Sequence, residues 1–235
     1  MTESSGRDAI EPGLPLSAQV YRILKQAIVC AELPPGERLS DIDLARELEI
    51  SRQPIREAFL RLQTDDLLDV RPQRGTYVKR ISVTAVKDAR FVREAIEADI
   101  VTLLAQEADA AVVRELEQQL AAQRGVLQSA PQQFMKLDDE FHRTLAEGAG
   151  KPYAWRVIEG VKTQMDRVRF LSFNHYHVER LIHQHALVVE AIANGRSVEA
   201  METMRMHLRG ILDSIHEIAG EYPAYFEEGG VESFS

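Results

Sequence analysis

Residues 44–62, LARELEISRQPIREAFLRL, decide the fold of the first part of this 235-residue chain. Leu44, Ala45 and Leu48 follow helical spacing and lead into a short turn at 49–51. Ser51 is a capping residue for a second helix, whose apolar stripe is formed by Ile55, Ala58, Phe59 and Leu62. Pro54 lies in the first turn of this second helix, where proline is tolerated. Two helices joined by so short a turn predict a helix-turn-helix.

The sequence on either side completes this motif. An earlier apolar stripe predicts a helix from Leu16, with Ser17 as its cap, which ends at the breaker Leu33-Pro34-Pro35-Gly36. Downstream, the runs at 67–70 and 76–78 flank a turn that contains glycine, which predicts a β-hairpin. Three helices and a hairpin over residues 16–80 predict a winged helix-turn-helix.

The rest of the chain is expected to be an all-α helical bundle. Beyond residue 81 the apolar pattern is helical throughout and does not alternate as strands do. The expected helices lie near residues 83–107, 109–128, 132–148, 152–173, 177–193 and 197–219. The fold class is therefore mainly α, with a disordered arm at 1–15, a winged domain at 16–80, a bundle at 81–221 for effector binding and dimerisation, and a tail at 222–235.

Composition narrows the class of protein. Hydrophobic residues make up 45% and charged residues 28%, as in soluble globular proteins, and no apolar run approaches the ~20 residues of a membrane span. The single cysteine, Cys30, excludes an intramolecular disulfide and fits a reducing compartment. Together with the lack of a signal segment, this predicts a cytoplasmic, nucleoid-associated protein without a membrane partner.

The net charge of −9 hides a basic segment. Within residues 51–80, seven basic residues outnumber four acidic ones. Arg52 and Arg56 share one face of the helix that follows Ser51, with Gln53 beside them. Arginine can bind guanine or phosphate, and glutamine can pair with adenine. Arg71, Arg74 and Gly75 form the tip of the hairpin, which is placed to touch the DNA backbone or the minor groove.

Any one of these arginines alone is better explained as part of a solvated surface. Helix order, a polar reading face and a basic wing together predict binding to double-stranded DNA. The run from Leu44 to Leu62, followed by Leu67-Leu68 and by Arg74-Gly75-Thr76-Tyr77-Val78, resembles the signature of the GntR family of transcription regulators. Gln53 stands where relatives often have threonine or another small polar residue, so an operator preference is not carried over.

In the bundle, polar residues interrupt the apolar helical faces. Asp138 and His142 project from the inner face of the helix near 132–148. His185 lies at the centre of the next apolar stripe, and His207 borders the stripe of the last helix. One Asp and three His on three helices form either a metal site with N and O ligands or a buried Asp–His network without metal. Spacing alone leaves both alternatives open.

Two arginines also lie inside apolar stripes, Arg93 and Arg169. A guanidinium in such a place requires an anion, because burying an unpaired charge is costly. That anion is either a carboxylate of the chain, such as Glu97 or Asp138, or a bound acid. Both arginines are therefore candidate effector-binding residues.

The bundle resembles the FCD ligand-binding domain of the FadR subfamily. Its three signatures appear in Asp138-x-x-Phe141-His142, His185-x-x-Val188-x-x-Ala191-Ile192 and Met204-Arg205-x-His207-Leu208, and its opening segment in Val92-Arg93-x-x-Ile96-Glu97. The resemblance implies that Asp138, His142, His185 and His207 are ligands of a divalent transition metal, with zinc the first choice and nickel or manganese as alternatives. It also implies a small carboxylate effector that reaches the metal and a nearby arginine.

These features predict a ligand-responsive transcription regulator, a repressor that binds a palindromic operator as a homodimer. The alternative is a metal-dependent enzyme domain fused to a DNA-binding module. We favour the regulator and not an enzyme, because no general base is positioned beyond the metal ligands.

Overall fold

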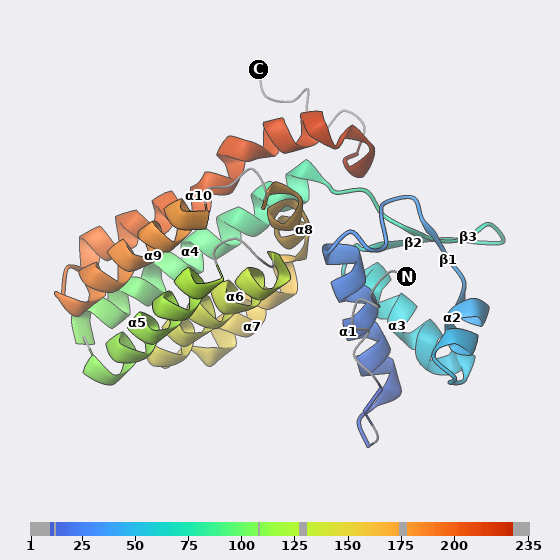
Figure 1. Ribbon diagram of the computed structural model, residues 1–235, viewed down its shortest axis with the longest axis horizontal. Coiled ribbons are helices and arrows are strands. Elements are labelled where there is room, and N and C mark those ends of the chain that lie inside the picture. The colour runs from blue at the N-terminus through green and yellow to red at the C-terminus, as the bar shows by residue number, and fades with distance from the viewer. Residues whose placement is uncertain (1–9, 12, 108, 127–130, 174–177, 228–235) are drawn as a thin grey trace. The chain divides into compact units, whose positions relative to one another are not determined.

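The computed structural model of the protein describes residues 10–11, 13–107, 109–126, 131–173 and 178–227. Helices dominate these residues, and the few strands form one small sheet, as the mainly α prediction requires (Figure 1). The chain divides into two compact units. One comprises Met1–Ile81 together with Ala224–Glu227, and the other contains Ser82–Pro223.

The first unit is a winged helix-turn-helix. Its elements are α1 (Leu16–Val29), β1 (Arg38–Leu39), α2 (Asp41–Glu47), α3 (Arg52–Thr64), β2 (Leu68–Arg71) and β3 (Gly75–Val78). The stripe predicted for α3 is buried in the core of this unit, against α1 and the hairpin. The hairpin was predicted, whereas β1 was not, because a strand of two residues leaves no readable alternation. β1 pairs antiparallel with β3, which lies between β1 and β2.

Two of the three helices begin where they were predicted to begin, but without the predicted side-chain caps. Ser17 does not cap α1, because it lies inside the helix, which begins at Leu16 as predicted, and Pro15 occupies the N-cap position. Ser51 does occupy the N-cap position of α3, but its side chain accepts no capping hydrogen bond. Ser40 caps α2, since its Oγ accepts a hydrogen bond from the backbone N–H of Asp43.

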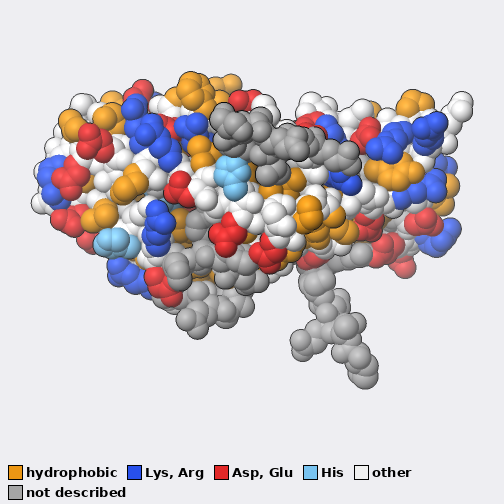
Figure 2. Space-filling view, turned by 90° about the horizontal axis from the view of Figure 1, so that it is seen from above, with side chains coloured by type: hydrophobic (Ala, Val, Ile, Leu, Met, Phe, Trp, Pro, Cys, Tyr) orange, Lys and Arg blue, Asp and Glu red, His pale blue; other side chains and the backbone are white. Residues whose placement is uncertain are grey.

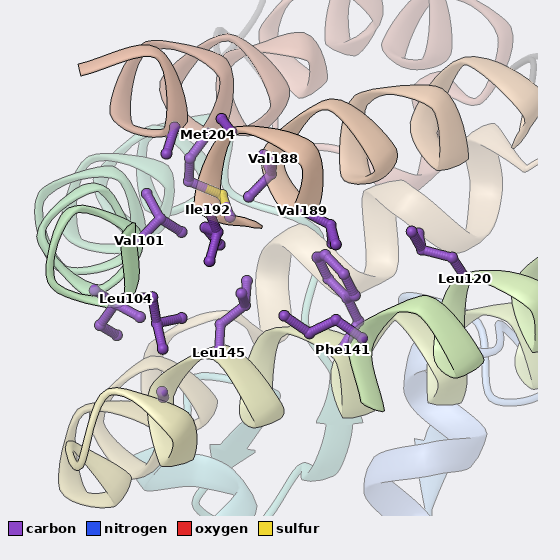
Figure 3. Close-up of a cluster of buried hydrophobic side chains, with 14 of the residues drawn as sticks. Val101, Leu104, Leu120, Phe141, Leu145, Val188, Val189, Ile192 and Met204 are labelled. Atoms are coloured by element: carbon purple, nitrogen blue, oxygen red, sulfur yellow. The ribbon is translucent and has the colours of Figure 1, made fainter. Parts of the chain in front are cut away.

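The second unit is a helical bundle of α4 (Val83–Glu107), α5 (Ala110–Gly125), α6 (Pro131–Gly148), α7 (Pro152–Val161), α8 (Thr163–Ser172), α9 (Val178–Ala193) and α10 (Ser197–Glu221). α4 packs against α9 and α10, and α5 packs against α6 and α9. Figure 3 shows their apolar side chains interlocking, among them Val101, Phe141, Leu145, Val188 and Ile192. Within the described residues, no helix has the length and hydropathy to cross a membrane.

The single helix expected at 152–173 is wrong, because the chain bends at Lys162 between α7 and α8. Lys162 has ψ near −7°, which departs from helical geometry. Its side chain is buried, and its Nζ donates hydrogen bonds to Asp139 on α6 (2.8 Å) and Asp166 on α8 (2.6 Å). The amphipathic pattern continues across the bend, so the sequence gives no sign of it.

A loose tail over 222–235 is also wrong for its first residues. Pro223–Tyr225 form a 3-10 turn, and Phe226 makes a parallel bridge with Ile81. The backbone N–H of Ile81 donates to the Tyr225 carbonyl at 2.7 Å, and Phe226 is only 2% exposed. The rest of the expected tail, 228–235, and residues 1–9 of the expected arm lie outside the described residues.

Phe226→Ala is expected to lower the free energy of unfolding of the first unit by about 3 kcal/mol, since it removes a buried aromatic ring. The sole tryptophan, Trp155, is in the second unit and reports on that unit by fluorescence. Calorimetry should therefore show that the unfolding transition of the first unit moves to a lower temperature. The unfolding transition of the second unit, followed by Trp155 fluorescence, should keep its temperature. Phe91→Ala is the control, because Phe91 is 66% exposed. Equal shifts of both transitions would contradict the prediction.

Candidate metal centre and nucleic-acid interface

Four polar side chains meet inside the second unit. Asp138 and His142 come from α6, His185 from α9 and His207 from α10. All four are buried, and one ligand atom from each lies within 4.8 Å of the others. His185 Nε2 is 3.2 Å from His207 Nε2 and 3.6 Å from Asp138 Oδ1. The structure thus brings together the four residues that the helical faces singled out.

The outer nitrogen of each imidazole is held by an acceptor on another helix. His142 Nδ1 donates to the Glu97 carboxylate, and His207 Nδ1 lies 3.2 Å from Gln184 Oε1. His185 Nδ1 lies 2.9 Å from Gln123 Oε1, whose amide is oriented because its Nε2 donates to the Leu137 carbonyl. With the proton on Nδ1, the lone pair of each ring is on Nε2, which faces the centre of the cluster.

This donor set fits a metal ion. Among the described residues, His142 Nε2 and both oxygens of Asp138 are buried without a hydrogen bond, although Asp138 Oδ2 forms an ion pair with Arg169 Nη2. Buried polar atoms usually have partners, and lone pairs that face each other repel. Nitrogen and oxygen ligands bind transition metals at about 2.0–2.2 Å, so ligands on opposite sides of an ion are about 4.2 Å apart. The distances of 3.2 Å and 3.6 Å from His185 Nε2 to His207 Nε2 and Asp138 Oδ1 lie within that limit, and all four donors lie within 4.8 Å of one another.

The charge states of these residues also suit a cation. Burial lowers the pKa of His185 to about 3 and that of His207 well below its usual value, so both rings are neutral at pH 7. Burial alone would raise the pKa of Asp138, but Arg169 and the three neighbouring histidines together outweigh this effect and hold that pKa well below normal. The cluster therefore offers neutral imidazoles and an ionised carboxylate.

Arg93 and Arg169, the two arginines predicted inside apolar stripes, both have carboxylate partners within the chain. Arg93 Nε donates to Glu97 Oε1 at 2.6 Å, with both side chains buried. Arg169 Nη2 lies 2.5 Å from Asp138 Oδ2, and its Nη1 reaches Asp166 at 3.3 Å. Glu97 also accepts from His142, so Arg93 supports a ligand position through one intermediate residue.

A cavity of about 50 Å³ adjoins the cluster. Its polar lining consists of Arg93, Asp138, Arg169, Ser172 and His207. Aromatic, aliphatic and methionine side chains form most of the remaining wall, among them Phe134, Met165, Phe173, Leu181, Leu208 and Ile211. The cavity exceeds the space of a single water, which needs about 10–15 Å³ on this scale, and it combines cationic groups with an apolar wall.

The predicted DNA-reading residues of α3 are exposed. The side chains of Arg52 and Arg56 are 47% and 56% exposed, and both donate to Asp41 Oδ2 from α2. The hydrogen bond from Arg56 is the largest cause of the lowered pKa of Asp41. Gln53 is exposed beside them and donates to Glu57. The apolar side of α3 is buried, so this polar face is the one that a ligand can reach.

The wing carries the remaining predicted residues. Arg71 pairs with Asp69 at 2.7 Å and lies over the Tyr77 ring, and Arg74 is exposed at the turn. Gly75 has φ +116°, and a Cβ there would lie 2.8 Å from Arg38 Nε, so the turn needs glycine. Figure 2 shows Lys and Arg side chains gathered, among some acidic ones, at the right-hand end of the first unit.

Both units match known sequence families. Residues 16–78 match the family described as bacterial regulatory proteins, gntR family, and residues 88–210 match the FCD domain. The chain belongs to the GntR family and carries an FCD domain. The resemblance seen in the sequence is thereby confirmed, and this GntR protein is a transcription regulator and not an enzyme. The alternative of a fused metal-dependent enzyme domain is not supported.

Relatives of this GntR regulator cover nearly all of it. The HTH-type transcriptional repressor RspR of Escherichia coli is 37% identical over 93% of this chain and 97% of its own length. A regulator from an unstable DNA locus of Streptomyces ambofaciens is 34% identical, with 88% of each chain covered. The solved structure of E. coli McbR/YncC has the same fold, with a TM-score of 0.72 at 20% identity, covering 89% of this chain and 99% of that one.

The sequence did not reveal every residue that surrounds the cluster. Glu97 was named only as an alternative partner of Arg93, and its contact with His142 was missed. Gln123 and Gln184 were missed altogether, because a glutamine in an amphipathic helix gives no sign that it is buried. Of the histidines excluded from the site, His183 and His216 are exposed, and His175 and His177 lie outside the described residues.

His185→Ala is expected to abolish stoichiometric metal binding, because it removes a central ligand and leaves Asp138 and His207 without a shared partner. Elemental analysis of the purified protein and calorimetric titration with Zn²⁺ measure the effect. His183→Ala is the matched control, since His183 lies on the same helix two residues earlier and is exposed. Retention of one tightly bound metal per chain in His185→Ala would refute the site.

Proposed function

We propose that this GntR regulator is a homodimeric repressor that releases or retains its operator according to a small carboxylate bound at a metal-containing pocket. The observation that carries the proposal is the convergence of Asp138, His142, His185 and His207 beside a cavity that also presents Arg93 and Arg169.

DNA recognition is assigned to the exposed face of α3, with Arg52, Gln53 and Arg56 as the reading residues. Helix-turn-helix proteins insert the second helix of the motif into the major groove and contact bases with its N-terminal residues. These three residues occupy the first turns of α3. We assign Arg71, Arg74 and Gly75 of the wing to contacts with the backbone or the minor groove.

The metal ligands are proposed to be the four clustered residues. When bound, a divalent cation supplies positive charge and exchangeable coordination positions that attract an oxygen ligand. Three imidazoles and one carboxylate favour zinc, with nickel and manganese as alternatives. Glu97, Gln123 and Gln184 hold the rings so that the Nε2 lone pairs stay directed at the centre.

The charges around the cavity favour an anionic effector. The contacting network contains four carboxylates, of Glu97, Asp138, Asp139 and Asp166, and three cationic side chains, of Arg93, Lys162 and Arg169. Its formal charge is −1, so a divalent cation brings the total to +1. A monocarboxylate neutralises that remainder, whereas a cationic ligand would add to it.

The size and wall of the cavity narrow the class of acid. A volume of about 50 Å³ suits a small metabolite better than a long acyl chain. The arginines and the metal would bind the carboxylate, because guanidinium pairs well with carboxylate, and the apolar wall would contact the rest of the molecule. Arg93 and Arg169 are both assigned to this role, in addition to their ion pairs within the chain.

Binding at this pocket would connect α4, α6, α8 and α10, which carry its polar lining. Such an effector changes operator binding only to the extent that its affinity differs between the DNA-competent and DNA-incompetent states. The repressor role is drawn from the printed name of the relative RspR. A homodimer on a palindromic operator follows because one reading helix covers a short site. A regulator of this kind works on the chromosome, in the cytoplasm.

Arg52→Ala and Arg56→Ala are each expected to weaken operator binding by about 1–3 kcal/mol, the value of a base contact. A duplex selected from a randomised pool by the parent protein serves as the operator, and fluorescence anisotropy gives the affinities. Arg46→Ala is the control, since Arg46 is exposed on α2 and pairs with Asp43. If neither α3 variant differs from that control, α3 is not the reading helix.

Arg93→Ala is expected to keep the metal but to lose most of the response to acids, because one cationic side of the cavity disappears. The parent and the variant, both loaded with zinc, are screened by thermal shift against a panel of small carboxylates. Arg90→Ala serves as the control, because Arg90 lies on the same helix, pairs with Glu94 and is not part of the cavity wall. An unchanged acid response in Arg93→Ala would restrict Arg93 to its ion pair with Glu97.

A further inference from the structure

Asp41 of α2 connects the two arginines of the reading helix. Its Oδ2 accepts hydrogen bonds from Arg52 Nη2 (2.8 Å), Arg52 Nε (3.2 Å) and Arg56 Nε (2.8 Å). The Asp41 side chain is 22% exposed, less than half the exposure of either arginine. One carboxylate oxygen, 11 residues before Arg52 and 15 residues before Arg56 in the sequence, therefore binds both guanidinium groups.

The contacts with Asp41 leave the terminal nitrogens of Arg56 available to a base, whereas Arg52 uses both its Nε and its Nη2. Asp41 engages only the Nε–H of Arg56, so the terminal nitrogens of that guanidinium are not used by Asp41. Guanine is read by a planar guanidinium that presents two donors at once to O6 and N7. A long arginine side chain loses much rotamer freedom when it binds, and a side chain that is already oriented loses less.

Asp41 is not required to begin its helix. Ser40 caps α2 through its Oγ, which accepts from the backbone N–H of Asp43. Asp41 also places a negative charge at the surface that faces DNA, where it repels phosphates and weakens binding to any sequence. A carboxylate at this position therefore lowers the affinity for DNA in general, and it can favour one DNA sequence over another.

We infer that Asp41 is a specificity-determining residue of the DNA-reading surface, which orients Arg52 and Arg56 toward their bases and disfavours unselected DNA. It acts through the two arginines as a positioning residue. The inference rests on the reading role proposed for α3, and the experiment separates the failure of one from the failure of the other.

The test compares Asp41→Asn with Asp43→Asn in the full chain. Asp43 lies two residues away, pairs with Arg46 and is 69% exposed, so both variants lose one charge from the same helix. Affinities are measured by anisotropy for the duplex selected by the parent and for a scrambled duplex of equal length, over a range of salt concentrations. The measured quantity is the affinity for the selected duplex divided by the affinity for the scrambled duplex.

Asp41→Asn is expected to lower this ratio about tenfold, at the scale of one base contact. The selected duplex should bind more weakly, and the scrambled duplex should bind equally well or more tightly. Asp43→Asn should keep the parental ratio to within about twofold, because its charge is not in contact with the reading arginines. A ratio in Asp41→Asn equal to that in Asp43→Asn overturns the inference.

A second variant of Asp41 distinguishes the effect of the carboxylate's position from the effect of its charge. Asp41→Glu keeps the charge but moves the carboxylate by one methylene, so it should also lower the ratio. If Asp41→Asn binds both duplexes more weakly by the same factor and Asp41→Glu has the parental ratio, Asp41 supports only the fold. The double variant Arg52→Ala/Arg56→Ala tests the reading role of α3 itself. If this variant keeps the parental ratio, α3 is not the reading helix, independently of the results for Asp41.

Discussion

Most of the second unit is organised around the fixed orientation of three buried imidazole rings. Each ring has its outer nitrogen against an oxygen acceptor on a different helix, and its inner nitrogen at a shared centre. This requires α4, α5, α6, α9 and α10 to meet at fixed distances, since α4 supplies Glu97 and α5 supplies Gln123. The apolar core of the second unit sets the spacing of these helices, and the polar contacts set the rotation of each helix about its own axis.

Local features of the fold and the central residues of the site could be predicted from the sequence. The α3 stripe and the four clustered residues follow from a repeat of about 3.6 residues, which assigns each side chain to one face of its helix. The family resemblance then turned an Asp–His network into a candidate metal centre. Features that depend on long-range packing could not be predicted, because periodicity contains no information about which faces meet.

Particular residues illustrate this limit. Glu97 and His142 are 45 positions apart, and Gln123 and His185 are 62 apart. Lys162 separates α7 from α8 without a proline, and its ammonium group donates to two carboxylates there. Asp41 resembles any acidic residue in a first helical turn until its contacts with α3 are seen.

The bridge between Ile81 and Phe226 has a consequence for synthesis on the ribosome. Phe226 follows its partner by 145 residues, and the second unit lies between them in the sequence. Translation adds about 5–20 residues per second, so Phe226 is added roughly 7–30 seconds after Ile81. The part of the protein that is made first is therefore completed last, and a nascent chain acquires its full winged helix-turn-helix unit only after the helical bundle has been made.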